Sequence, residues 1–300
     1  PVEEMDILSW VYAMLGRLRY PNNHDHDRWS VALMVIGQAA TGKSTIADFV
    51  QSMFEPEDVG IMQARAERDF GTSALVVKEH GRYRFRHLIV APEMSSSERG
   101  IDQTMWQSII SGGPDHPDRP GEKVAVAIKN VTPQIIQPQS QVLMCGNERI
   151  QFQDPHGQFS RRVLELSFNR AVRPEDKDAL LKDRMLGELP FFIVKANRAY
   201  RSKFELCGGL SGDVWGLSPY DDPASGQRCP NLPAYFHAAK ERVSAEANIM
   251  KRFLQENEAD LIFDPAAYIT VEVFRSLFNT WCLAVNDGRR AKWETKTYEL

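Results

Sequence analysis

A short glycine-rich stretch near the N-terminus has the residue types and the spacing needed to bind phosphate. It consists of Gly37, Gln38, Ala39, Ala40, Thr41, Gly42, Lys43, Ser44 and Thr45, and it fits the pattern GxxxxGK(S/T). Glycines at its two ends allow backbone angles that turn successive N–H groups inward around a phosphate. Lys43 can reach the β- and γ-oxygens, and Ser44 can supply a hydroxyl to Mg²⁺. The stretch therefore predicts a site for a nucleoside triphosphate, ATP, together with Mg²⁺.

Two polar residues that follow apolar runs are candidates to act with this loop. Glu93 comes after residues 88–91, and a carboxylate at such a strand end can hold the Mg²⁺ shell and activate water. Asn147 comes after residues 142–145, and its amide can orient the attacking water without adding charge. Each residue has a plainer interpretation, as a surface glutamate and as a turn asparagine. Their order after the phosphate-binding loop favours the catalytic interpretation.

Arg161 and Arg162 precede an apolar run, at residues 163–168. Adjacent arginines are usually solvated, and this is the alternative interpretation. After a phosphate-binding loop, an acid and an asparagine, the pair indicates an arginine finger. A guanidinium that reaches the γ-phosphate of a neighbouring subunit stabilises the charge of the transition state. This role requires an oligomer.

The elements that position these residues can be read from hydrophobic patterns. Residues 29–36 form a continuous aliphatic run, which is typical of a strand buried on both faces of a parallel sheet. The segment 43–54 has apolar residues at helical spacing and predicts an amphipathic helix. Short apolar runs at 86–91 and 141–145 predict two more strands. Residues 123–136 predict a β-hairpin around Lys129. Strands alternating with helices indicate an α/β fold with a parallel sheet.

The composition is that of an ordinary folded protein with more than one unit. The chain has 300 residues, 43% of them hydrophobic and 25% charged, with a net charge of −4. These values exclude a globally basic nucleic-acid coat, although a local basic surface remains compatible with them. The expected units are an N-terminal helical segment at 1–30, a P-loop core at 31–170, a helical extension at 171–207, a linker at 208–233 and a C-terminal unit at 234–300.

Membrane insertion and a disulfide scaffold are both disfavoured by the sequence. The longest apolar run, at 31–36, is far shorter than the roughly 18–20 residues that a membrane span needs. The cysteines are Cys145, Cys207, Cys229 and Cys282, and no two of them form a CxxC pair. We therefore expect a soluble, intracellular protein with reduced thiols. The start at Pro1 without a leader predicts a fragment of a longer protein.

At this point the chain resembles the superfamily 3 helicases, in the branch of viral and phage primase–helicases of the poxvirus type. The resemblance rests on the phosphate-binding loop, Glu93, the Gly-Gly-Pro-Asp stretch 112–115, the hairpin, Asn147, the two arginines and Phe168. Segments 187–196 and 274–282 are similar to regions that follow the core in this branch. The resemblance implies an AAA+-type three-layer P-loop core, a helical extension and a small winged-helix-like C-terminal domain.

The resemblance also implies a function. Such a protein is an ATP hydrolase and DNA helicase, a homo-oligomeric ring, usually a hexamer, that pulls single-stranded DNA through its pore. A linked primase or polymerase and a virus- or phage-encoded replication role in the host cell belong to the same picture. The hairpin would face the pore, with Lys123 at its base and Lys129 near its tip as phosphate contacts. A ring that encloses its strand needs few basic residues, so a net charge of −4 is compatible with this role.

The sequence departs from the family pattern in three places, and other functions remain open. Glu93 is followed by Met94 rather than by a second acid, Gln107 stands where a lysine is usual, and Asn147 lacks the common downstream proline. The alternatives are a ring ATPase that loads, remodels or packages without unwinding, and a monomeric P-loop kinase or GTPase. The lack of an Asn-Lys-x-Asp motif weakens the GTPase. A metal cluster at 24–27 is a further, weaker alternative to a solvated loop.

Overall fold

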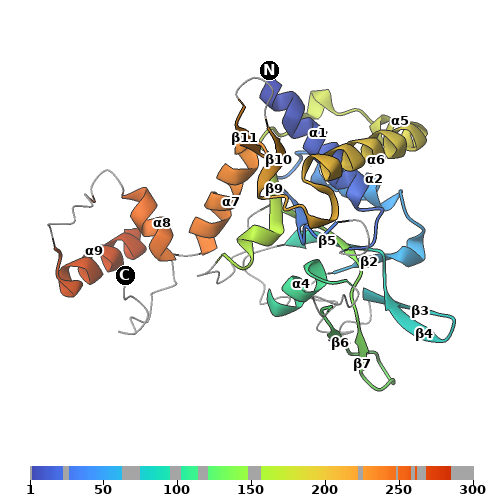
Figure 1. Ribbon diagram of the computed structural model, residues 1–300, viewed down its shortest axis with the longest axis horizontal. Helices are drawn as coiled ribbons and strands as arrows, with labels where there is room; N and C mark the ends of the chain where they lie inside the picture. Colours follow the sequence, from blue (N-terminus) through green and yellow to red (C-terminus); the bar gives the residue numbers. More distant parts are fainter. Residues whose placement is uncertain are drawn as a thin grey trace.

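A five-stranded parallel sheet in the order β2-β5-β8-β1-β9 forms the centre of the protein (Figure 1). The computed structural model describes residues 2–22, 27–62, 75–94, 103–113, 121–147, 157–221, 226–247, 249–257, 261 and 268–284. The strands are β1 (Ala32–Gly37), β2 (Val59–Ile61), β5 (Leu88–Met94), β8 (Gln141–Gly146) and β9 (Val163–Phe168). The strands predicted from the sequence correspond to β1, β5 and β8. The prediction of an α/β fold with a parallel sheet is confirmed.

Strand β1 lies inside the sheet, between β8 and β9. Ile36 near its end pairs with Gly146 of β8, and Gly37 pairs with Phe168 of β9. On the far side of β8, Met94 of β5 also pairs with Gly146. Because the strands are parallel, their carboxyl ends meet at one edge of the sheet. Open α/β sheets bind their ligands at this edge.

Both faces of the sheet are buried, and successive residues of β1 alternate between them. Leu33 and Val35 belong to one core, whereas Met34 and Ile36 belong to the other. The first core is covered by α1 (Val2–Arg17), α2 (Lys43–Gln51) and α6 (Leu189–Leu206). The second is covered by α4 (Gln103–Ile110) and by two β-hairpins. The sheet therefore lies between two covering layers, and the N-terminal helix α1 belongs to the first of them.

The two hairpins project from the second face of the sheet (Figure 1). One consists of β3 (Val76–Glu79) and β4 (Arg82–Phe85), and the other of β6 (Val124–Val126) and β7 (Gln134–Ile136). Both are antiparallel. Lys129 lies in the turn of the second hairpin beside Asn130, which has a positive φ of 63°. The hairpin predicted around Lys129 is confirmed, whereas the β3–β4 hairpin is an additional element.

A buried ion pair connects α1 to the segment before β1 and to α6. Arg17 donates from Nε and Nη2 to the two carboxylate oxygens of Asp27, both at 2.8 Å, and from Nη1 to the carbonyl of Val31. The Tyr200 hydroxyl donates to the same carboxylate at 2.5 Å. Residues 24–26 of the weaker metal hypothesis lie outside the described residues. Asp27 itself is buried and ion-paired rather than part of a solvated loop.

The segment 208–233, where a linker is expected, contains short ordered elements. It contains the 3₁₀ turn η5 (Gly209–Ser211) and the antiparallel strands β10 (Leu217–Asp221) and β11 (Arg228–Pro230). Val214 and Leu232 are buried in the first core. The physical reason is that two well-placed apolar side chains are enough to fix a stretch rich in Gly, Ser and Pro against the core.

The regular structure after β11 is helical in the part of the chain that the structure describes. Helix α7 (Ala234–Ala247) packs on the sheet, where the Tyr235 hydroxyl accepts a hydrogen bond from the Ser167 N–H at 2.8 Å. Helices α8 (Ile249–Glu256) and α9 (Val271–Ala284) share a small core around Phe253 and Phe278. The winged-helix-like domain stays a prediction. The remaining elements are η1 (Pro56–Asp58), η3 (Ser160–Arg162), η4 (Pro174–Asp176) and α5 (Leu181–Gly187). None of the described helices is both long and apolar enough to cross a membrane.

Candidate nucleotide-binding site

The phosphate-binding loop joins the end of β1 to the start of α2, as its sequence predicts. Helix α2 begins at Lys43, and its first turn is closed by the N–H of Ile46 donating to the carbonyl of Gly42 at 3.0 Å. Ala40 and Gly42 both have positive φ, at 62° and 94°. An alanine in the left-handed region costs about 1–2 kcal/mol, so the loop holds a strained backbone of the kind found at ligand sites. The helix N-terminus adds a partial positive charge.

Lys43 is held inside the curve of the loop by the loop's own backbone. Its ammonium donates to the carbonyl oxygens of Gly37 and Gln38, both at 2.6 Å. The hydroxyl of Thr41 donates to the same Gln38 carbonyl at 2.9 Å. Ser44, in the first turn of α2, is exposed. The loop therefore presents a positioned cation and a free-facing hydroxyl next to a helix N-terminus, which fits a triphosphate with its Mg²⁺.

Two contacts anchor this loop to the strand β9 beyond it. A Cβ on Gly37 would lie 2.3 Å from the carbonyl oxygen of Phe168, so only glycine fits at the end of β1. The N–H of Val172 donates to the carbonyl of Ala40 at 2.8 Å. The position of the loop thus depends on β9 and on the residues that follow it.

Glu93 and Asn147 are brought to the same edge of the sheet by β5 and β8. Glu93 lies near the end of β5, where the register with β8 shifts between Ala91 and Met94. Asn147 directly follows β8 and is exposed. Strand β8 separates β5 from β1, so the backbone of Asn147 lies between the loop and the end of the strand that carries Glu93.

The neighbouring strand β8 also places a thiol close to the loop. Burial raises the pKa of Cys145 to about 11, and the positive charge of Lys43 opposes this effect. The thiol is therefore neutral at physiological pH and is not a nucleophile.

Arg161 and Arg162 lie at the amino ends of the strands, opposite to the carboxyl ends that carry the phosphate-binding loop. They form η3, directly before β9, and Val163 pairs with Ala32 at the start of β1. The start of β1 is five residues from Gly37, which corresponds to about 16 Å along a strand. That distance is greater than an arginine side chain can span. Neither arginine can therefore reach the phosphate-binding loop of its own chain.

The two arginines differ in what holds them. Arg162 donates from Nε to the Ser111 hydroxyl at 2.7 Å, and its guanidinium also donates to the carbonyl of Gln158. Arg161 is exposed, and its backbone carbonyl accepts a hydrogen bond from the Trp215 indole at 2.7 Å. Arg162 is thus held within its own chain, whereas Trp215 fixes the backbone of Arg161 and leaves the side chain facing solvent.

The candidate DNA contacts lie on the β6–β7 hairpin. Lys123 directly precedes β6, Lys129 lies in the connecting turn, and both are exposed. Gly112 and Gly113 of the Gly-Gly-Pro-Asp stretch are buried after α4, and the rest of that stretch lies outside the described residues.

The β3–β4 hairpin carries further cationic and aromatic side chains that sequence reasoning missed. They are Lys78, Arg82 and Tyr83. The available signal was the polar and aromatic alternation of residues 82–85 directly after Gly81. In the structure His80 and Gly81 both have positive φ and form the turn.

Comparison with known proteins gives likenesses of structure alone. No protein-family model matches the chain, and no curated protein matches it. An apo structure of the NrS-1 C-terminal region aligns with 90% of this chain and 57% of its own, at 14% identity and a TM-score of 0.48. A structure of NrS-1 C-terminal residues 305–718 aligns with 62% of this chain and 38% of its own, at 16% identity and a TM-score of 0.39. A structure of JCV helicase aligns with 85% of this chain and 61% of its own, at 10% identity and a TM-score of 0.36. The chain thus spans 38% to 57% of the length of these NrS-1 chains.

Proposed function

We propose that this chain is an ATP-dependent DNA helicase motor of the superfamily 3 type, from a viral or phage primase–helicase. The observation that carries the proposal is the meeting of three strand ends at one edge of a parallel sheet. The phosphate-binding loop follows β1, Asn147 follows the adjacent β8, and Glu93 lies near the end of β5. An AAA+-type P-loop ATPase requires a loop, a polar residue and an acid in this spatial order.

The roles of the residues follow from their chemistry. Lys43 and the backbone N–H groups of the loop bind the β- and γ-phosphates. Ser44 and Glu93 would hold Mg²⁺, and the ion, when bound, would neutralise negative charge on the phosphates. Glu93 accepts a proton from the attacking water, and Asn147 orients that water. Glu93 is the one carboxylate proposed for both tasks, since Met94 stands where a second acid could follow it.

The position of the arginines supports a ring. Because the sheet separates Arg161 from its own loop, a role at a γ-phosphate requires a second subunit that brings its loop to this edge. Arg161 is the better candidate for the finger, since the guanidinium of Arg162 is held by Ser111 and Gln158. A closed homo-oligomer, a hexamer in the proposal, gives every loop such a neighbour.

Single-stranded DNA is the proposed track, and the exposed lysines of the β6–β7 hairpin are its proposed contacts. Lys123 and Lys129 stand on a hairpin that projects from the sheet, as a pore-facing element of a ring would. Repeated around a ring, two cations in each subunit give a strongly positive channel in a protein whose net charge is −4. A linked primase or polymerase would copy the single strand that such a motor exposes.

Steady-state ATP hydrolysis, measured with and without oligothymidylate, tests the proposal. We expect wild-type turnover to rise when the oligonucleotide is added, Lys43→Ala to abolish turnover, and Arg201→Ala, an exposed cation on α6, to change nothing. Sizing with a non-hydrolysable ATP analogue should give an oligomer. A monomer with unstimulated turnover would contradict the proposal. Stimulated turnover without displacement of a duplex strand would indicate a loading or packaging motor instead.

A further inference from the structure

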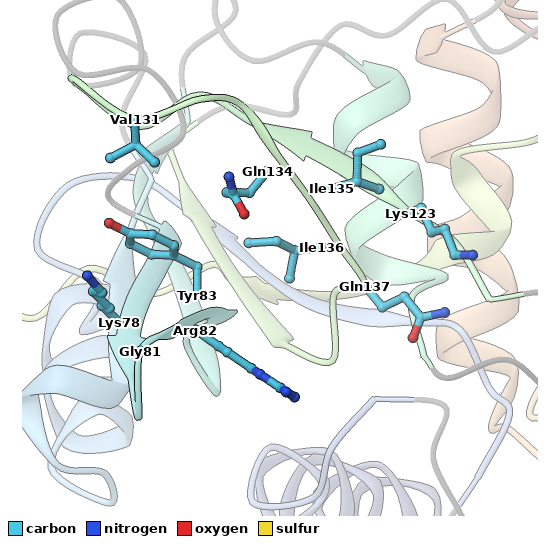
Figure 2. A pocket seen from close by; sticks show the side chains of 10 residues that line it. All are labelled: Lys78, Gly81, Arg82, Tyr83, Lys123, Val131, Gln134, Ile135, Ile136 and Gln137. Carbon is cyan, nitrogen blue, oxygen red and sulfur yellow. The ribbon is translucent and has the colours of Figure 1, made fainter.

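A cleft of about 750 Å³ lies between the β3–β4 and β6–β7 hairpins (Figure 2). Both hairpins contribute to its walls, with Tyr83 and Lys78 on one side and Gln134 and Ile136 on the other. Its volume lies within the range of roughly 300–1,000 Å³ that is typical of ligand sites. The β3–β4 hairpin, which bears one wall of this cleft, has no part in the nucleotide site.

We infer that this cleft binds a segment of single-stranded nucleic acid, with a base stacked on Tyr83 and the backbone phosphates held by Lys78, Arg82 and Lys123. The inference rests on the proposed function and specifies where the motor holds its track. It adds the β3–β4 hairpin to the contacts of the β6–β7 hairpin. It also makes Tyr83 the residue that distinguishes a nucleic acid from a polyanion without bases.

Tyr83 is suited to be a stacking platform because its ring is held in place. The ring is half-buried against the second core, and Ile136 of the β6–β7 hairpin lines the same cleft. The cross-strand partner of Tyr83 is Lys78, whose ammonium lies 5.8 Å from the centre of the ring. In the view of Figure 2 the ring lies between Lys78 and Val131, and Val131 belongs to the turn of the β6–β7 hairpin. An aromatic ring fixed beside a cation is the arrangement that binds successive nucleotides irrespective of sequence.

The charge of the cleft favours a polyanion. The side chains that line it include Lys78, Arg82 and Lys123, and none of the described lining residues is acidic. The acid nearest in the hairpin, Glu79, forms an ion pair with Arg84, which also pairs with Asp58. These two carboxylates share the one guanidinium of Arg84, so the three cations that line the cleft still outnumber the single acidic charge left over.

The stacking contribution can be tested with two substitutions of Tyr83 in the full chain. The probe is fluorescein-labelled oligothymidylate, and its anisotropy reports binding. Tyr83→Phe keeps the ring and should leave affinity within about twofold. Tyr83→Leu keeps apolar volume but removes the ring, and should weaken binding at least about fivefold, the lower end of the loss of one base–aromatic stack. Equal affinity of the Phe and Leu variants, both with wild-type thermal unfolding, would overturn the inference.

The phosphate contacts can be tested by salt dependence. Each lost contact to a single strand should reduce the slope of log K against log salt by about 0.7. Lys78→Ala with Arg82→Ala should therefore reduce it by about 1.4, while Arg201→Ala should not. A slope in the double variant equal to that of Arg201→Ala would overturn the inference. So would an equal loss of polyglutamate and oligothymidylate binding in Tyr83→Leu, because polyglutamate has no base to stack.

The same measurements separate this inference from the proposed function. Lys43→Ala should lose ATP turnover and still bind oligothymidylate with wild-type affinity. A wild-type chain that binds the oligonucleotide through Tyr83 but hydrolyses no ATP would contradict the proposed motor and support the cleft. A wild-type chain whose turnover is stimulated by oligothymidylate, with no effect of Tyr83→Leu on binding, would support the motor and overturn the cleft.

Discussion

Gly37 at the end of β1 and Phe168 at the end of β9 pack backbone against backbone. A Cβ on Gly37 would lie 2.3 Å from the Phe168 carbonyl oxygen and 3.0 Å from the Thr41 hydroxyl. No side chain can be added there without moving either the strand or the loop. The contact makes the geometry of the phosphate-binding loop dependent on the edge strand of the sheet.

We predict that Gly37→Ala lowers the free energy of unfolding by about 1–3 kcal/mol, as overpacking of a filled site does. It should also abolish the increase in thermal stability that ATP with Mg²⁺ gives to the wild type. Gly187→Ala is the matched control, because a Cβ there meets nothing within 4 Å at an exposed helix end. It should be neutral or stabilising by up to about 1 kcal/mol. Unchanged nucleotide stabilisation in Gly37→Ala would refute the proposed importance of this contact.

Glu93→Gln and Lys43→Ala should separate chemistry from binding. Glu93→Gln removes the base but keeps an oxygen at the site, so ATP binding should persist while turnover falls by about 10²-fold or more. Lys43→Ala removes the contact to the β- and γ-phosphates and should weaken binding as well. Fluorescence titration with a labelled ATP analogue measures the first quantity, and phosphate release measures the second. Equal loss of affinity in both variants would argue against the role of Glu93.

Arg161→Ala and Arg162→Ala should differ when each is mixed with Lys43→Ala. If Arg161 acts on a neighbouring subunit, turnover should return when Arg161→Ala is mixed with Lys43→Ala, because an intact loop of the first then meets an intact arginine of the second. Arg162→Ala should instead lower thermal stability, because it removes the hydrogen bond to Ser111. Phosphate release across a series of mixing ratios measures the effect. Turnover that never exceeds the sum of the two separate variants would contradict a shared site.

The buried pair of Arg17 and Asp27 predicts a pH-dependent stability. Burial alone would raise the pKa of Asp27, but the charge and hydrogen bonds of Arg17, together with Tyr200, hold it below its ordinary value. This carboxylate therefore stabilises the fold above the unfolded pKa of about 3.9, and its contribution is lost as the pH falls through the lowered pKa.

Asp27→Asn should lower the free energy of unfolding by about 3–5 kcal/mol at neutral pH, because it leaves Arg17 buried without a counter-charge. The difference from wild type should shrink as the pH falls below about 4. Asp183→Asn, at an exposed position of α5, is the control and should stay within about 0.5 kcal/mol. Urea unfolding curves at several pH values measure both. A difference that stays constant down to low pH would show that the stabilisation does not come from the carboxylate charge.

The cysteines predict a simple labelling result. Burial raises the pKa of Cys145 to about 11 and that of Cys207 to about 12, and Cys282 is also buried, whereas Cys229 is exposed. At pH 8 a disulfide reagent that labels thiols should therefore modify about one cysteine per native chain, because the thiolate is the reactive form. The same reagent should modify all four cysteines of the denatured chain. Rapid reaction of a second thiol in the native chain would contradict the burial of these residues.

The elements closest to the nucleotide site were predictable because their signals are local. The aliphatic run at 29–36, the glycines of the loop and the helical spacing after Lys43 each specify one element by themselves. Glu93 and Asn147 could then be placed at one edge, because parallel strands end together. Their roles, like that of the arginines, stay predictions.

What escaped prediction depends on contacts between distant parts of the chain. Nothing in the run 24–27 shows that Asp27 turns inward to Arg17, ten residues away and on another element. Val214 and Leu232 are isolated apolar residues in a Gly- and Pro-rich stretch, so their burial depends on the core that receives them. The cleft requires two hairpins to lie side by side, and no pattern within either hairpin encodes that arrangement.

The two hairpins and the candidate catalytic residues stand at opposite ends of the same two strands. β4 continues into β5 and β7 continues into β8, while Glu93 and Asn147 belong to the far ends of these strands. A strand of this length, about 20 Å, is more than twice the distance over which salt screens charges in the cell. A polymer held by the hairpins and a triphosphate held by the loop would therefore influence each other through movement of β5 and β8, and not through direct electrostatic interaction.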